Sequence, residues 1–363
     1  MPRRSATMLA STLLLIALFC VALLVPAPYA EMSPGPTYNT LGDQNGKPVI
    51  VINGQKTYPT SGNLNMTTVE VSSADYQPNL ISALAGWFDS SMAIVPHDTL
   101  YPEGQTEQQA QQQNAEEFSS SQDSARTAAL TQLGYKVEAE VVVAAVVEDS
   151  PSIGKLHAGD VIVAVDGTPV TDPNQVGALV TKHQPGQNVV FTVIPVQKSS
   201  DVTETAAQRA AVEQQVTVTT AENPSTKKAM VGIQPDVEHT FPFDVEINLG
   251  DVGGPSAGLM FALGIIDKLQ PTNLTDGKFV AGTGTIDDQG NVGPIGGISM
   301  KMIAARNAGA QYFMTPADNC AEAASATPSG LTLVKETTLK GALAALADIR
   351  TGDTAALPSC SSK

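Results

Sequence analysis

The sequence predicts a multidomain protein of mixed α/β (α+β) class that carries one N-terminal transmembrane helix. An uncharged apolar run fills residues 8–25, and the 363 residues are enough for two or three hydrophobic cores. Strand-like and helix-like segments then alternate over the last third of the chain. The formal charge of -16 argues against general nucleic-acid binding, which needs basic surface.

Residues 8–25 have the length that a helix needs to span a bilayer. Two arginines precede the run and Glu31 follows it, which predicts a cytoplasmic N-terminus and an extracytoplasmic bulk at the cell membrane. The alternative is a signal peptide cleaved after Ala30. Pro28 stands where that cleavage site needs a small residue, and the run is long for a signal peptide, so we expect an uncleaved anchor.

Histidine and cysteine are too sparse for a structural metal site. None of the four histidines is close to another in sequence, and the three cysteines contain no Cys-x-x-Cys. We therefore expect no metal and no cofactor. Cys320 and Cys360 would share an oxidising compartment, and the sequence leaves open whether they pair.

Residues 31–133 are expected to form strands and helices ahead of the next domain. "KPVIVING" and "NMTTVEVSS" are typical of short strands, and "NLISALAGWFD" is typical of a short amphipathic helix. Residues 105–133 are rich in Gln, Ala and Glu and contain no Pro or Gly, which predicts a solvated helix.

A different pattern begins near Gly134. "VIVAVDGTPV" places two apolar stretches around a hairpin turn at Asp166-Gly167, and "DPNQVGALVTKH" opens with a capping Asp172 and a proline in the first turn. This order, and "GKLHAGDVIVAVDGTPV" above all, resembles a PDZ domain over residues 134–198. The resemblance implies peptide binding by strand addition to a sheet edge. The alternative is a small structural α/β unit.

Ser256 in "DVGGPSAGLM" follows two glycines and a proline and opens an apolar helix that is predicted from Ser256 to about Leu269. The glycines permit unusual backbone dihedrals, and the helix dipole favours negative charge at this end. These features suit a nucleophile. Serine is also among the best helix N-caps, so the local pattern leaves both roles open.

A nucleophilic serine needs a base, and His239 is the only histidine in this region, in a strand-like stretch. A lysine can serve if its pKa falls from about 10.4 to about 7, which costs about 4.6 kcal/mol and requires burial. Lys268 lies about 18 Å along the same helix, and Lys278 lies in a polar turn. Lys301 opens an apolar helix after glycines and is the best placed.

"GGPSAGLMFAL", "AGTGTIDDQGNVGPIGGISMKMIAARNAGA" and "FMTPADN" together resemble the proteolytic domain of Lon proteases, over about residues 228–345. The resemblance implies that Ser256 is the nucleophile and that Lys301, 45 residues later, is its base. It further implies that Thr283 hydrogen-bonds the lysine. The amides at Gly253 and Gly254 are then expected to hold the oxyanion.

Two features depart from the Lon pattern. Thr285 stands where these enzymes usually have a glutamate, and "FPFDVEIN" stands where they have a histidine-bearing strand. The chain also contains no G-x-x-x-x-G-K-[ST], so we expect no ATP-driven unfolding of substrates.

Anchor, PDZ unit and Lon-like domain together resemble membrane-anchored bacterial PDZ/Lon-like proteins. The resemblance implies an ATP-independent serine endopeptidase with a Ser-Lys dyad. It would act on unfolded or tail-exposing proteins docked by the PDZ unit, and it would assemble as a homo-hexamer. The alternative is a non-catalytic peptide-binding adaptor with a degenerate Lon-like domain. The predicted parts are the cytoplasmic tip and anchor (1–30), a strand and helix region (31–133), the PDZ-like domain (134–198), a connecting segment (199–227), the Lon-like domain (228–350) and a C-terminal tail (351–363).

Overall fold

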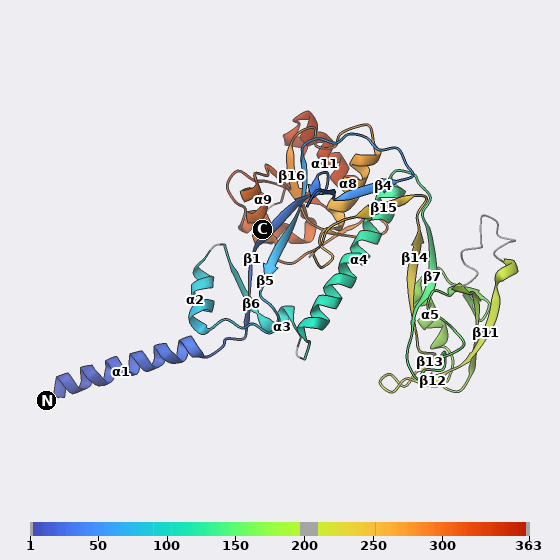
Figure 1. Ribbon diagram of the computed structural model, residues 1–363, viewed down its shortest axis with the longest axis horizontal. Coiled ribbons are helices and arrows are strands. Elements are labelled where there is room, and N and C mark those ends of the chain that lie inside the picture. Colours follow the sequence, from blue (N-terminus) through green and yellow to red (C-terminus); the bar gives the residue numbers. More distant parts are fainter. Residues whose placement is uncertain (1–2, 90, 103, 197–209, 251, 361–363) are drawn as a thin grey trace. The chain divides into compact units, whose positions relative to one another are not determined.

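The computed structural model of this chain describes all residues except 1–2, 90, 103, 197–209, 251 and 361–363 (Figure 1). The chain divides into two compact units. The main unit combines Met1–Tyr135 with Phe243–Lys363, and the inserted unit comprises Lys136–Pro242. These units cut across the predicted limits, because N-terminal segments share one unit with the Lon-like segments.

A six-stranded sheet forms the centre of the main unit, in the order β20-β19-β16-β5-β1-β6. Its strands are β1 (Tyr29–Asn39), β5 (Asn63–Val71), β6 (Ala93–Pro96), β16 (Phe279–Gly282), β19 (Tyr312–Pro316) and β20 (Thr332–Glu336). Strand β5 pairs in parallel with β16, and β1 pairs antiparallel with both β5 and β6. In Figure 1 the blue β1 and β5 therefore lie beside the orange β16. The middle of β5 is buried on successive residues, as a strand between two covered faces requires.

Helices α8 (Gly258–Leu269) and α9 (Ile298–Ala308) cover opposite faces of this sheet. A Cβ at Gly282 would meet Met260 of α8, whereas the preceding residue Ala281 clusters with Ile298 and Met302 of α9. Successive residues of a strand point to opposite faces, so the two helices lie on different sides of β16.

Helix α4 (Glu107–Gln132) packs against α8, with Phe118 edge-to-face on Phe261 at 5.8 Å. The helix predicted over residues 105–133 therefore forms, but it is not solvated on every side. Ala125, Ala128 and Ala129 belong to a buried stripe of mostly small residues. Small side chains allow α4 to approach α8 closely, while the glutamines of its first half remain exposed or half-buried.

The remaining elements of the main unit are short, apart from α1 (Arg3–Leu24) and α11 (Leu339–Thr351). They are β2 (Asp43–Gln44), β3 (Lys47–Pro48), β4 (Ile50–Asn53), β15 (Asp244–Ile247), β17 (Thr285–Ile286), β18 (Val292–Gly293), α2 (Leu80–Phe88), α3 (His97–Leu100), α10 (Cys320–Ser325), η1 (Ala317–Asn319) and η2 (Thr354–Ala356). Residues Thr7–Leu24 of α1 are long and apolar enough to cross a membrane, a property that an N-terminal signal sequence shares.

The inserted unit is built on a second sheet, in the order β11-β10-β8-β7-β14. Its elements are β7 (Glu138–Val146), β8 (Val161–Val165), β9 (Thr168–Pro169), α5 (Pro173–Val180), β10 (Asn188–Ile194), β11 (Gln214–Thr219), β12 (Ala221–Glu222), β13 (Ala229–Met230) and β14 (Ile233–Thr240). The predicted cap of α5 is confirmed, because the Asp172 side chain accepts from Asn174 N. The predicted hairpin is confirmed too, with positive φ at both Asp166 and Gly167.

Strands β11 and β14 belong to the inserted unit, although β11 lies in the predicted connecting segment (199–227) and β14 lies in the predicted Lon-like domain (228–350). Strand β11 pairs with β10, and β14 pairs with β7 from Ile233 to Thr240. Ile233 packs against the valine-rich core of this unit, which explains why β14 completes the second sheet.

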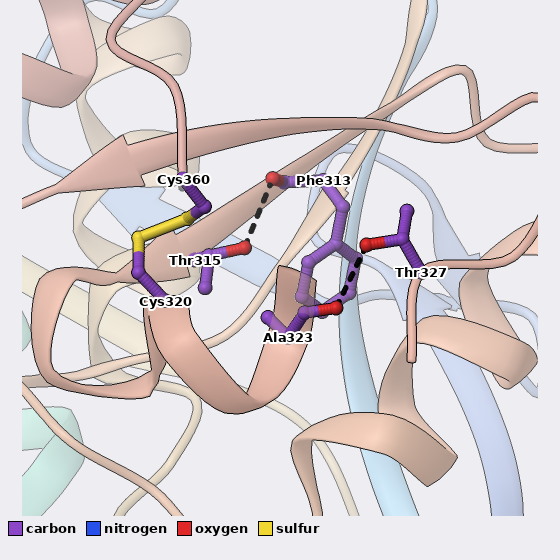
Figure 2. The surroundings of a disulfide bond; sticks show 6 residues. All are labelled: Phe313, Thr315, Cys320, Ala323, Thr327 and Cys360. Atoms are coloured by element: carbon purple, nitrogen blue, oxygen red, sulfur yellow. Dashed lines mark hydrogen bonds between the residues drawn. A yellow bond between two sulfur atoms is a disulfide. The ribbon is translucent and has the colours of Figure 1, made fainter. Parts of the chain in front are cut away.

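Cys320 and Cys360 form a disulfide, which the sequence had left open (Figure 2). The bond joins the start of α10 to the C-terminal segment, beside Thr315 of β19. Pro358 of the same segment accepts a hydrogen bond from Lys335 N on β20 at 2.8 Å. The C-terminal residues up to Cys360 are thus fastened to the outer strand of the sheet.

We expect Cys360→Ala to lower the free energy of unfolding of the oxidised protein by roughly 2–4 kcal/mol, because the bond closes a long loop in the unfolded chain. Urea unfolding of the full chain in detergent, followed by circular dichroism, measures this. Cys20→Ala is the matched control, since Cys20 is a free, exposed cysteine of α1. Equal midpoints for both variants would show that the disulfide does not stabilise the fold.

Candidate active site

Ser256 lies in the loop before α8 and does not cap that helix. The helix begins at Gly258, two residues later than predicted, and Ala257 holds the N-cap position. Gly254 has a φ of 80°, which only glycine adopts readily. The loop therefore presents Ser256 ahead of the helix, where its hydroxyl is free to meet another group.

Two residues of α4 hold this loop. Asn114 O accepts from Gly254 N at 2.8 Å, and Ser121 Oγ donates to Pro255 O at 2.9 Å. A Cβ at Gly253 would lie 2.9 Å from the Asn114 Cβ, so α4 also explains why glycine stands there. Sequence reasoning assigned α4 no part in the site, since nothing in its Gln-rich pattern indicates these contacts.

Lys301 is buried in α9, only 2% exposed, and its side chain reaches Ser256. The Lys301 Nζ lies 2.6 Å from Ser256 Oγ and 3.1 Å from Thr283 Oγ1. The third partner is Thr67 O of β5, at 3.2 Å. The structure thus brings together Ser256, Thr283 and Lys301, and it adds a backbone carbonyl that the sequence could not reveal.

The partners of Lys301 suit a neutral amine. Thr67 O can only accept, and Thr283 Oγ1 donates its own hydrogen to Ser256 O at 2.9 Å, so it accepts from the lysine. These two bonds use both hydrogens of an uncharged amine, and its lone pair remains for the Ser256 hydroxyl. Burial lowers the pKa of Lys301 to about 7, so the neutral form is accessible near neutral pH.

Ser256 lies between two hollows of the main unit. A pocket of about 230 Å³ contains Ser256 and Lys301 and is walled by residues of β1 and β5, Tyr38 and Val69 among them. A second hollow of about 360 Å³ contains Ser256, Thr285 and the loop Pro294–Gly296. Ser256 therefore lines both hollows.

Asn319 fixes the loop that walls the second hollow. Its Oδ1 accepts from Ile295 N and its Nδ2 donates to Ile295 O, both at 2.9 Å. The same loop leads through Gly297, which has a φ of 68°, into the helix that carries Lys301. The side-chain amide therefore holds both the wall of the hollow and the approach to α9.

Two known domain families match parts of the chain. Residues 117–232 match the PDZ domain family, and residues 189–343 match the family described as Lon protease (S16) C-terminal proteolytic domain. The chain carries a PDZ domain and a Lon-type proteolytic domain. Both domain types predicted from the sequence are thereby confirmed.

The curated relatives are Lon proteases that match over the Lon-type domain. Lon protease 1 of Bacillus subtilis (strain 168) is 33% identical over 96 residues, which cover 26% of this chain and 12% of that protein. Lon protease 2 of the same strain is 35% identical over 101 residues, which cover 27% of this chain and 17% of that protein. Lon protease 1 of Herpetosiphon aurantiacus is 36% identical over 93 residues, which cover 25% of this chain and 11% of that protein. The chain thus spans between 11% and 17% of the length of these relatives.

Among solved structures, the chain is similar in part to PDZ domains of SdrC-like proteins. The domain from Listeria innocua is 20% identical and covers 26% of this chain and 92% of its own, with a TM-score of 0.21. The domain from Listeria monocytogenes is 19% identical and covers 26% of this chain and 86% of its own, also with a TM-score of 0.21.

In the Lon-type domain, the predicted oxyanion amides are only partly available. The Gly254 N–H is taken by Asn114 O, because α4 packs against this loop, so it has no hydrogen left for an oxyanion. Gly253 lines the pocket beside Ser256. Within the described part of the chain, the amides of Gly253 and Ser256 have no hydrogen-bond acceptor.

The other candidate bases lie elsewhere. His239 is on β14 of the inserted unit, and Lys268 is in the last turn of α8. Lys278 lies immediately before β16, in the turn with Thr275. Among the residues that the structure describes, no group of three or more His, Cys, Asp or Glu is arranged for a metal ion.

The buried lysine makes stability depend on pH. Because folding lowers the pKa of Lys301 from 10.5 to about 7, the unfolded chain binds a proton that the folded chain lacks between these pH values. The free energy of unfolding should therefore rise with pH across this window, by up to about 1.4 kcal/mol per pH unit relative to Lys301→Met.

Urea unfolding of both proteins between pH 7.5 and 10 measures the difference in slope. The variant loses the hydrogen bonds of Lys301 at every pH, so this loss shifts its curve without changing the slope. All other titrating groups are common to the two proteins. Parallel curves for wild type and Lys301→Met would show that folding does not perturb Lys301.

Proposed function

We propose that this protein is a serine endopeptidase that hydrolyses peptide bonds with Ser256 as nucleophile and Lys301 as general base, without ATP. The observation that carries this proposal is the contact of 2.6 Å between Ser256 Oγ and a buried Lys301 Nζ. A base whose pKa lies near 7 is best suited to take a proton at neutral pH. The Lon-type domain around the pair supports the same reaction class.

The reaction proceeds in two halves. Neutral Lys301 takes the Ser256 proton as Oγ attacks the peptide carbonyl carbon, and it then gives that proton to the leaving nitrogen as the C–N bond breaks. Water next attacks the acyl ester while Lys301 takes its proton, and Ser256 regains a proton as the new carboxylate leaves. Thr67 O and Thr283 Oγ1 hold Nζ in place, and the ammonium that forms transiently keeps both as acceptors.

The backbone amides of Gly253 and Ser256 are proposed to stabilise the oxyanion of the tetrahedral intermediate. Gly254 orients the loop through its bond to Asn114 O instead. Preorganised amides contribute most in sites that exclude water, and the Lys301 side of this pocket is buried.

Substrates are proposed to bind as extended chains. Strand β16 pairs with β5 only from Asn63 to Met66, so the following residues of β5 offer an edge beside the pocket. An extended peptide can add to such an edge. Because no nucleotide-binding motif accompanies the domain, the substrates are proteins that are already unfolded or that expose a tail.

The PDZ domain is proposed to dock these chains by the same strand-addition mode, at an edge of the sheet that ends in β11 and β14.

Helix α1 is proposed to anchor the protein in the cell membrane, with its folded units outside the cytoplasm. The Cys320–Cys360 disulfide supports an oxidising compartment. By resemblance to Lon, we propose a homo-hexamer.

Hydrolysis of unfolded casein without nucleotide tests the proposal. We expect Ser256→Ala to abolish the acyl-enzyme route and Lys301→Met to lower kcat/KM by about 10²–10⁴-fold, because the general base is lost. Lys268→Met is the matched control and should cleave like wild type. Wild-type cleavage by Ser256→Ala would refute the dyad, and an inert wild type that still binds peptides would favour a non-catalytic adaptor.

We also expect kcat/KM to increase tenfold per pH unit below about 7 and to level off above it, because only neutral Lys301 can accept the serine proton. Initial rates with a fluorogenic peptide between pH 5 and 9 give this profile, and Lys268→Met should preserve the midpoint. A midpoint near 10 would mean that the lysine is charged in the free enzyme, contrary to the mechanism.

A further inference from the structure

Helix α2 (Leu80–Phe88) buries its small residues and exposes its large apolar ones. Ala83 and Gly86 face inward, and a Cβ at Gly86 would lie 2.5 Å from Ile94 Cδ1 on β6. The outward face carries large side chains that are strongly exposed, namely Leu80 (44%), Leu84 (42%), Trp87 (52%) and Phe88 (90%). A helix at the surface of a water-soluble protein shows the reverse arrangement.

The four exposed residues form one continuous face. Their spacing of four, three and one residues places them on the same side of an α-helix. The helix contains no charged residue. A contiguous apolar face of this kind marks a surface that another apolar phase or molecule covers.

The chain entering α2 is bonded to the residues that follow the candidate membrane span. Helix α1 ends at Leu24. Pro26 then pairs with Asn79 in an isolated antiparallel β-bridge, and Ala27 N donates to Pro78 O at 2.8 Å. Asn79 is the N-cap of α2, and its side chain accepts from Ser82 N. The start of the apolar face is therefore fixed close to the point where the chain would leave the bilayer.

Tyr29, the first residue of β1, holds one edge of the face. Its ring lies edge-to-face against the Trp87 ring, with the centroids 5.5 Å apart. Trp87 is thus packed on one side by a residue five positions after Leu24, while about half of its surface stays exposed.

We propose that the face formed by Leu80, Leu84, Trp87 and Phe88 docks into the interface of the lipid bilayer beside α1. This inference rests on the proposed membrane anchoring by α1. Tryptophan is enriched at the level of the lipid headgroups, and an apolar helix face buries itself about 5–10 Å into the boundary between headgroups and acyl chains. A single span leaves a domain free to pivot on its linker, whereas this second contact fixes the orientation of the main unit toward the bilayer.

Tryptophan fluorescence tests the docking directly, because Trp87 is the only tryptophan in the chain. The full-length protein is reconstituted into phosphatidylcholine vesicles, with or without bromine on the acyl chains near the headgroup. We expect brominated lipid to quench the Trp87 emission. We also expect the emission maximum in vesicles to lie at shorter wavelength than that of the same protein without lipid. Leu80→Ser/Leu84→Ser/Phe88→Ser keeps the probe and should abolish the quenching.

Val147→Ser/Ile153→Ser is the matched control, since it removes comparably exposed apolar residues from the inserted unit and should leave the quenching intact. Equal emission in the two lipids would overturn the proposal. A blue shift that depends on protein concentration and is insensitive to bromine would also overturn it, because a second copy of the chain would then cover the face.

Labelling of Cys20 separates this inference from the anchoring on which it rests. Cys20 lies within α1 and is the one cysteine outside the disulfide, so insertion should protect it from a membrane-impermeant maleimide. If Cys20 is protected and Trp87 is not quenched, the anchoring stands and the docking is overturned. If Cys20 reacts freely, the anchoring fails, and the docking beside α1 fails with it.

Discussion

The site depends on placing a lysine amine in the interior, with no carboxylate partner among the residues that the structure describes. Burial is the cause that lowers the Lys301 pKa, and the amine is satisfied by two acceptors and one hydroxyl. A buried charge without a counterion is strongly disfavoured, so this environment selects the neutral base. The glycine-rich turn at Gly297, which starts α9, and the close packing of Ala281 against α9 both serve to keep the side chain in this position.

The surroundings of the amine come from distant parts of the chain. Strand β5 supplies the Thr67 carbonyl and one wall of the pocket, and α4 fixes the loop that carries Ser256. Both precede the inserted unit in the sequence. The Lon-type segment therefore does not complete its own site, because its sheet needs β5 beside β16 and its serine loop needs the support of Asn114 and Ser121.

The sequence was informative where the chemistry requires particular residue types at particular spacings. The blocks around Ser256, Thr283 and Lys301 predicted that these side chains belong together, and the structure places them within hydrogen-bonding distance of Nζ. Every residue has a backbone carbonyl, so the residue types do not show that Thr67 O and Asn114 O take part in the site. The residue types also do not show which distant strands pair. The strand-like pattern of β5 gave no sign that its neighbour would be β16, and that of β14 gave no sign of which sheet it would join.

The central claim is that burial lowers the Lys301 pKa to about 7, so that the neutral amine is accessible near neutral pH, and NMR can measure this pKa directly. Lysines labelled with ¹³C at Cε shift when the amine titrates, and Lys301→Met identifies the signal. The account predicts a midpoint near 7 for Lys301, well below the ordinary pKa of a lysine side chain. A Lys301 midpoint at the ordinary lysine value of about 10.4 would contradict it, because the amine beside Ser256 would then be charged at neutral pH.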